Sequence, residues 1–174
     1  MGPEPIRRIF LISFLLGIKA NIIKPFSWGK DGYNSIWGAM NMLQFTEELL
    51  TGVPEMDLQH KTLVDLLNQV YQLLMDGERA SAQKLFKEKL LEYVETHLSE
   101  EEKFMESIGY PELEAHKRLH ETFRKEIIRL APAIEEGSKK AFEQALALSW
   151  GWLYTHITKA DKKYGAFAKE KGLI

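Results

Sequence analysis

The histidines of this chain share the helical period of the apolar residues around them, and this register constrains the fold more than any other feature. His97 and Glu101 lie four residues apart, as do His116 and His120. On a helix, residues four apart project from the same face about one turn apart. Each of these two segments therefore presents a pair of metal-type side chains on the face that its apolar residues assign to the core.

Four segments with helical periodicity follow residue 40, separated by turns that contain glycine or proline. Apolar residues recur at steps of three and four along each segment, and no strand-like alternation interrupts them. Four long helices with short connections predict an all-α protein, an antiparallel up-down-up-down four-helix bundle. The expected helices run over about 55–75, from a cap at Ser81 to about 108, from about 112 to a kink or end at Pro132, and from about 139 onward.

His60 and His156 complete the five histidines, on the first and fourth expected helices. A lone histidine on an apolar face is more often a hydrogen-bonded core residue than a ligand. Five imidazoles on core-facing positions, with none in a loop, would be costly to bury unpaired. Glu101 shares their register, whereas its neighbours Glu100 and Glu102 can stay in water. The pattern therefore predicts a metal site inside the bundle.

Asp161 is a further candidate ligand, although its spacing is irregular. It follows His156 by five residues, which adds about 140° of rotation on an ideal α-helix. A π-type bulge would bring the two side chains into phase, and such bulges are frequent at functional sites. Alternatively, Asp161 reaches the core from the flank of the helix.

Composition narrows the chemistry of the site. The chain has no cysteine, which excludes disulfides, thiolate metal sites, iron–sulfur clusters and thiol nucleophiles. Any metal must therefore be held by nitrogen and oxygen. The formal net charge is −2, with acidic and basic residues interspersed, so no basic stripe for nucleic acid is present. We expect no nucleic-acid partner.

The first 39 residues differ in pattern from the rest. A basic pair, Arg7-Arg8, precedes an apolar run that resembles part of a signal peptide but lacks a convincing cleavage site. The run is too short for a bilayer, which needs about 20 apolar residues, so we expect no stable membrane span and a cytoplasmic protein. Three interpretations are open: translation starts at Met40 or Met42, the segment targets the protein, or it anchors at a membrane surface. The expected division is an extension over 1–39 and a four-helix domain over 40–174.

Four motifs along the chain carry a family resemblance. They are GVPEMDLQHKTLVDLLN around His60, HLSEEEKFM at His97 and Glu101, YPELEAHKRLHETF at His116 and His120, and WLYTHITKADKKY at His156 and Asp161. With these motifs the chain resembles the hemerythrin family, in its bacterial single-domain form, from Leu49 to Ala168. It departs from the family at Phe45, where members often have tryptophan, and in residues 1–39, which have no counterpart.

The resemblance implies a non-haem centre of two iron ions with an oxo or hydroxo bridge. One coordination position would stay open, on the iron that has fewer histidines, and dioxygen would bind there. By the same resemblance, His116, His120 and His156 hold one iron, His60 and His97 hold the other, and Glu101 and Asp161 bridge the two.

The implied function is reversible binding of dioxygen for transport, storage or delivery, and not enzymatic catalysis. Other readings remain open: an oxidoreductase or sensor acting on peroxide or nitric oxide, a protein of iron storage or repair, or a purely structural metal bundle. Zinc also suits a nitrogen and oxygen site, so the identity of the metal rests on the resemblance.

Overall fold

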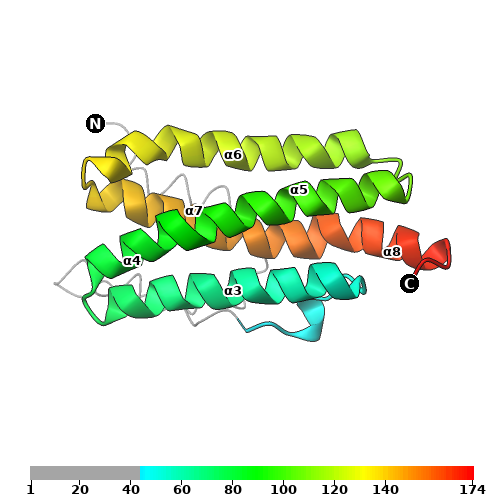
Figure 1. The fold of residues 1–174 in the computed structure, drawn as a ribbon, viewed down its shortest axis with the longest axis horizontal. Helices are drawn as coiled ribbons and strands as arrows, with labels where there is room; N and C mark the ends of the chain where they lie inside the picture. Colours follow the sequence, from blue (N-terminus) through cyan, green and yellow to red (C-terminus); the bar gives the residue numbers. More distant parts are fainter. Residues whose placement is uncertain (1–43) are drawn as a thin grey trace, which may run out of the picture. The chain divides into compact units, whose positions relative to one another are not determined.

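The computed structural model describes residues 44–174, and all regular structure in this range is helical (Figure 1). Two π-helical turns, η2 and η3, each join two α-helices without a break in the chain's helical path. The interpretations of residues 1–39 lie outside the described residues. In chain order the elements are η1 (Glu47–Leu49), α3 (Pro54–Met75), α4 (Arg79–Leu85), η2 (Phe86–Leu90), α5 (Leu91–Ser107), α6 (Leu113–Glu135), α7 (Lys139–His156), η3 (Ile157–Asp161) and α8 (Lys162–Glu170).

The helices form four antiparallel rods: α3, the continuous segment α4–η2–α5, α6, and the continuous segment α7–η3–α8. Helix α3 packs against α4 and α5, α5 packs against α6, and α6 packs against α7 (Figure 1). Short turns join consecutive rods, so each rod runs in the direction opposite to its neighbour along the chain. The predicted all-α, up-down-up-down four-helix bundle is confirmed.

The rods end where glycine permits a left-handed backbone. Gly77 and Gly137 have positive φ angles of 81° and 84°. In each turn, the next N–H bonds back to the carbonyl five residues earlier, as in a Schellman motif: Glu78 N to Leu73 O is 2.8 Å, and Ser138 N to Ala133 O is 2.9 Å. After Gly137, the side chain of Ser138 caps α7, as its predicted start near residue 139 requires.

The predicted start of the second helix is wrong, and so is an end at Pro132, which was one of two alternatives predicted for the third helix. Helix α4 begins at Arg79 and not after Ser81, because the turn at Gly77 needs only one further residue before helical geometry resumes. Helix α6 continues through Pro132 to Glu135. The proline removes an N–H that would bond the carbonyl of Ile128, but Ile128 is 68% exposed, so water can reach that face of the helix.

The bundle core is apolar apart from one polar layer and the separate buried side chains of Thr51 and Ser149. The apolar faces of the helices are largely buried; α5 buries Leu98 and Met105, while its Val94 and Phe104 are only half-buried. Because α5 contacts both α3 and α6, its buried stripe is wider than a single helix–helix seam.

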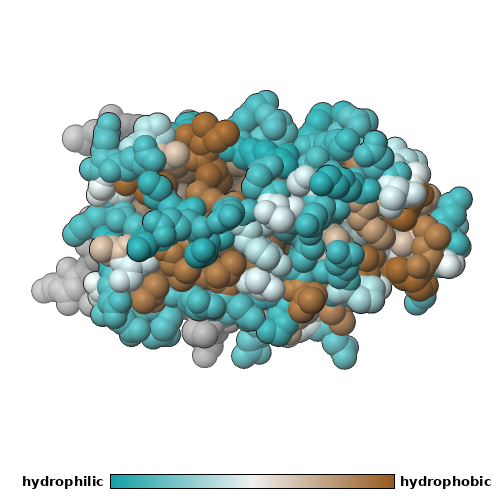
Figure 2. All heavy atoms as spheres, in the orientation of Figure 1, coloured by the Kyte–Doolittle hydropathy of each residue, from teal (hydrophilic) through white to brown (hydrophobic). Residues whose placement is uncertain are grey.

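The face in Figure 2 is mostly hydrophilic, with separate hydrophobic patches between the helices. Among residues 44–174, no helix combines the length and hydropathy needed to cross a membrane.

Candidate metal centre

The polar layer of the core consists of the predicted metal-type side chains, and every rod contributes at least one. Each of these side chains is at most 5% exposed. The expectation that all five histidines face the core is therefore confirmed. Helix α3 supplies His60, α5 supplies His97 and Glu101, α6 supplies His116 and His120, α7 supplies His156, and η3 supplies Asp161.

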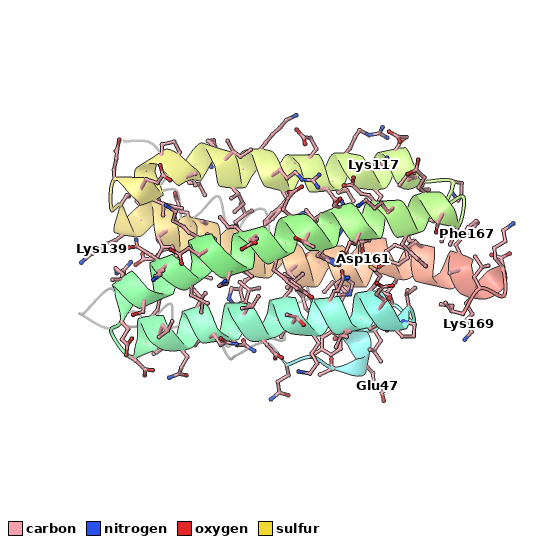
Figure 3. The ribbon with its side chains drawn as sticks, in the orientation of Figure 1. Glu47, Lys117, Lys139, Asp161, Phe167 and Lys169 are labelled. Carbon is pink, nitrogen blue, oxygen red and sulfur yellow. The ribbon has the colours of Figure 1, made fainter. Side chains whose placement is uncertain are left out.

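The π-helical turn η3 resolves the irregular spacing of Asp161. It covers Ile157–Asp161, directly after His156. One Asp161 oxygen, Oδ1, lies 3.1 Å from Nε2 of His156, so the two side chains share a face. Figure 3 shows Asp161 inside the bundle, whereas Lys139 and Lys169 extend away from it. The predicted π bulge is confirmed, and an approach from the flank is not needed.

The carboxylate of Glu101 lies between two sets of imidazoles. Its Oε2 is 3.0 Å from Nε2 of His120 and 3.2 Å from Nε2 of His116. It is also 3.8 Å from Nε2 of His156. The other oxygen, Oε1, lies on the opposite side, 3.9 Å from Nε2 of His60. Glu101 therefore presents one oxygen to each set.

Asp161 repeats this arrangement. Its Oδ1 is 3.4 Å from Nε2 of His116 and close to His156, while its Oδ2 is 3.3 Å from Nε2 of His60. His97 packs beside His60, with ring centroids 4.7 Å apart. The imidazoles thus form a three-histidine group (His116, His120 and His156) and a two-histidine group (His60 and His97), with both carboxylates between them.

Several buried polar atoms in this layer have no hydrogen-bond partner: Nε2 of His60, Oε1 of Glu101 and both oxygens of Asp161. Leaving such atoms unpaired in a core costs free energy, whereas a metal ion would satisfy them. In the three-histidine group, Nε2 of His120 and Nε2 of His156 are only 2.9 Å apart. Adjacent nitrogens at about 2.1 Å from one ion would be about 3 Å apart. The residues therefore fit metal ions held by nitrogen and oxygen.

Two imidazoles are held from behind by partners that the sequence reasoning missed. Nδ1–H of His97 donates to Oε1 of Gln59 over 2.8 Å, and the amide nitrogen of Gln59 donates to Glu100. Nδ1–H of His120 donates to Glu102 over 2.7 Å. These bonds leave Nε2 of each ring free to face the centre.

The prediction that Glu100 and Glu102 stay in water is therefore wrong, because both are half-buried against the site. Each missed residue precedes or follows a core residue by one position. A polar residue at such a flanking position borders the core. This position was the signal in the sequence that could have indicated a contact with the site.

Burial and hydrogen bonding shift the pKa values of the cluster in opposite directions. Burial alone would raise the pKa of Glu101, but hydrogen bonds from His116, His120 and His156 hold it well below its usual value. Burial lowers the pKa of His97 to about 4, against the opposing effect of Glu101. Burial also opposes a charge on His120, yet Glu101 and Glu102 raise its pKa. A raised pKa favours the protonated form of His120, and metal binding would displace the added proton.

Aromatic side chains cover one side of the three-histidine group. The indole of Trp152 stacks on the ring of His156, with centroids 4.2 Å apart and 15° between planes. Its other face stacks on Phe123 at the same distance. Trp152 is only half-buried, so it separates His156 from solvent. Trp152 lies one helical turn before His156 on the same face, and we predict a protective role for its indole.

Comparison with known proteins adds independent findings. The family model described as "Hemerythrin HHE cation binding domain" matches residues 51–168. A bacteriohemerythrin of Stenotrophomonas maltophilia is 31% identical over 125 residues, which cover 72% of this chain and 80% of that protein. A bacteriohemerythrin of Clostridium acetobutylicum is 29% identical over 127 residues, covering 71% of this chain and 98% of the relative. A myohemerythrin of Theromyzon tessulatum is 37% identical over 78 residues, covering 44% and 58%.

Proposed function

Because this chain belongs to the hemerythrin family, we propose that it binds dioxygen reversibly at two iron ions in the bundle core. One observation carries the proposal: each buried carboxylate presents one oxygen to the three-histidine group and the other to His60. A carboxylate shared in this way can bridge two cations. A site for a single ion would leave the second oxygen of each carboxylate unused.

These contacts support an assignment of the ligands, which is part of the proposal. The three-histidine group would hold one iron, and the two-histidine group would hold the other. Glu101 and Asp161 would each offer one oxygen to both irons, and solvent would supply an oxo or hydroxo group. Because the two-histidine group offers fewer protein ligands, its iron would have room for dioxygen.

Charge balance supports this set of ligands. Glu101, Asp161 and a bridging hydroxide offset all but one of the four positive charges of two ferrous ions, while neutral imidazoles add no charge. The lowered pKa of His97 and the strongly lowered pKa of Glu101 both favour the forms that bind metal, whereas the raised pKa of His120 means that metal must displace a proton there. A nearly neutral centre can be buried without a large desolvation penalty.

When bound, the iron pair supplies the electrons and the open position that reversible dioxygen binding requires. The chain must then exclude water from that position. One turn from the proposed ligands, Met56 and Met105 lie in a buried hydrophobic cluster with Val53, Tyr110 and Tyr164. Leu98, directly after His97, is also fully buried. These side chains cover the two-histidine group with apolar atoms on this side, while its polar connection towards the surface runs through Gln59 and Glu100 behind His97.

The composition of the ligand set favours a carrier over an enzyme. Di-iron enzymes of other bundle families use Glu-x-x-His motifs and carboxylate-rich sites. This chain has no Glu-x-x-His spacing, and imidazoles outnumber carboxylates in its core. Transport, storage or delivery of dioxygen is therefore the proposed role, ahead of reactions with peroxide or nitric oxide.

Visible spectroscopy tests the proposal. The iron-loaded protein is reduced, exposed to oxygen and returned to argon through several cycles. We expect an absorption band that appears and disappears with oxygen, and little turnover of added hydrogen peroxide. Glu101→Ala should abolish the band, whereas Glu106→Ala, on the exposed face of the same helix, should keep it. Rapid catalytic consumption of peroxide would favour an oxidoreductase instead.

A further inference from the structure

The two groups of imidazoles differ in what supports them from behind. His120 donates its Nδ1–H to a carboxylate, Glu102, over 2.7 Å. His97 donates its Nδ1–H to an amide oxygen, Gln59, over 2.8 Å. The two rings thus have the same orientation towards the centre but acceptors of different charge.

A network from α5 and α6 fixes Glu102 in place. The guanidinium of Arg124 donates to Glu102 over 3.3 Å and to the two oxygens of Glu95 over 2.9 and 3.1 Å. The side chains of Glu102 and Arg124 are 20% and 22% exposed, so most of this ion pair is shielded from solvent. The Glu102 carboxylate is therefore held against His120 before any metal arrives.

The acceptor behind a ligand imidazole changes how strongly that ligand binds. A hydrogen bond to a carboxylate is charge-assisted and draws the Nδ1 proton away from the ring more than an amide does. The opposite nitrogen becomes the better donor, and such partners are worth about 10- to 100-fold in metal affinity. On the two-histidine side, Glu100 lies one hydrogen bond further away, behind the Gln59 amide.

We propose that the two metal positions are unequal and that the three-histidine group fills first. In this proposal Glu102 is a positioning residue: through its hydrogen bond to His120, it makes the three-histidine group the tighter site. This inference rests on the proposed ligand assignment but does not depend on dioxygen binding. The order of filling matters chemically, because an ion in the first site fixes one oxygen of each shared carboxylate. The remaining oxygens are then oriented for the second ion.

Cobalt(II) titration of the metal-free full chain tests the order. Visible absorption of the bound ion reports each step, and elemental analysis gives the number of ions per chain. We expect two resolved steps. His60→Gln should remove the weaker step only, and His116→Gln should weaken the tighter step. The reverse assignment of the two variants would overturn the order of filling.

Substitution of Glu102 tests the positioning role. Glu102→Gln should weaken the first step by about 10- to 100-fold and leave the second within a few fold. Glu106→Gln, exposed on the same helix, serves as the matched control and should change neither step. Equal weakening of both steps by Glu102→Gln would indicate a general loss of structure and overturn the proposal.

The chain also offers a charge-conserving exchange on the other side. In the double variant Gln59→Glu/Glu100→Gln, an amide and a carboxylate trade places, so that the carboxylate contacts His97. We expect this exchange to tighten the second step by about 10-fold or more, whereas Glu100→Gln alone should not tighten it. No tightening would overturn the proposal even if Glu102→Gln fails to fold. Two ordered steps without oxygen binding would refute only the proposed function.

Discussion

Trp152 allows two roles to be distinguished by experiment: packing of the core and protection of the site from water. Its indole lies between Phe123 and His156 and is only half-buried. Trp152→Phe should leave the iron content unchanged and shorten the lifetime of the oxygenated form, because a smaller ring uncovers the edge of His156 to water. The decay of the oxygenated spectrum, followed well below the unfolding temperature, measures this effect.

A second tryptophan on the same helix provides the matched control. Trp150 is 9% exposed, and Trp150→Phe removes similar volume without touching the His156 stack. It should destabilise the fold by about 1 kcal/mol and leave the decay rate unchanged. If Trp152→Phe lowers stability in the same way and does not accelerate decay, Trp152 has a packing role alone.

At the scale of residues, the sequence predicts the side chains of the core layer but not those behind them. His97 and Glu101 share the apolar period of α5, and this period carries information only about the buried face. Gln59 and Glu102 lie one position from that face, where polar residues are expected whether or not they have a partner. Only the spacing of α3, α5 and α6 in three dimensions shows which of them contact an imidazole.

At the scale of elements, the π turn η3 contains one residue more than a regular helical turn. The residues before and after it still face the core on the same side of the helix. Lys159 lies on its exposed side. Deleting Lys159 should convert the turn into regular α-helix and bring Asp161 four residues after His156, on the same face. We therefore expect the deletion variant to retain its iron, measured per chain, and to be at least as stable.

A deletion within regular helix is the control for this experiment. Removing Thr155 from α7 rotates His156 by about 100° relative to the preceding core residues. That variant should lose its iron. Loss of iron from the Lys159 deletion, with helix content retained in circular dichroism, would show that the π geometry itself is required.

Helix α8 packs unusually close to the segment before α3. A methyl group at Gly165 would overlap the backbone carbonyl of Thr51. That backbone cannot easily yield, because the N–H and hydroxyl of Thr51 both donate to Asp57 over 2.7 Å. Gly165→Ala should therefore destabilise the fold by about 1–3 kcal/mol in urea unfolding.

Gly151 supplies the opposite case on the same rod. It is helical, and a methyl group there would meet nothing within 4 Å. Gly151→Ala should stabilise the protein by about 0.5–1 kcal/mol, because alanine loses less backbone entropy in a helix. Equal effects of the two substitutions would contradict the close approach of α8 to Thr51.

Helix boundaries were less predictable than helix faces. The faces follow from a period repeated over many residues, whereas a boundary depends on one local turn. The turn at Gly77 closes with backbone hydrogen bonds from Gly77 to Leu74 and from Glu78 to Leu73, and it places the start of α4 ahead of Ser81. Pro132 is tolerated because it lies in the last turn of α6 on an exposed face.

At the scale of the whole molecule, metal and stability should be linked. Without metal, the core contains unpaired polar atoms on His60, Glu101 and Asp161. Ions that bind the folded chain but not the unfolded chain stabilise the fold. The gain is about 4 kcal/mol when the free ion concentration is 1,000 times the dissociation constant. Removal of iron should therefore lower the melting temperature in calorimetry, and restoring iron should reverse the change. Equal melting curves would mean that no bound metal stabilises the bundle.

Two shared carboxylates are proposed to couple two irons in one core. Mössbauer and electron paramagnetic resonance spectra of the oxidised, iron-loaded protein, together with iron analysis, test it most directly. We expect two irons per chain whose spins cancel through the shared bridges, so that the ferric pair has no resonance signal at low temperature. One iron per chain, or two irons that each give the signal of an isolated ferric ion, would contradict it.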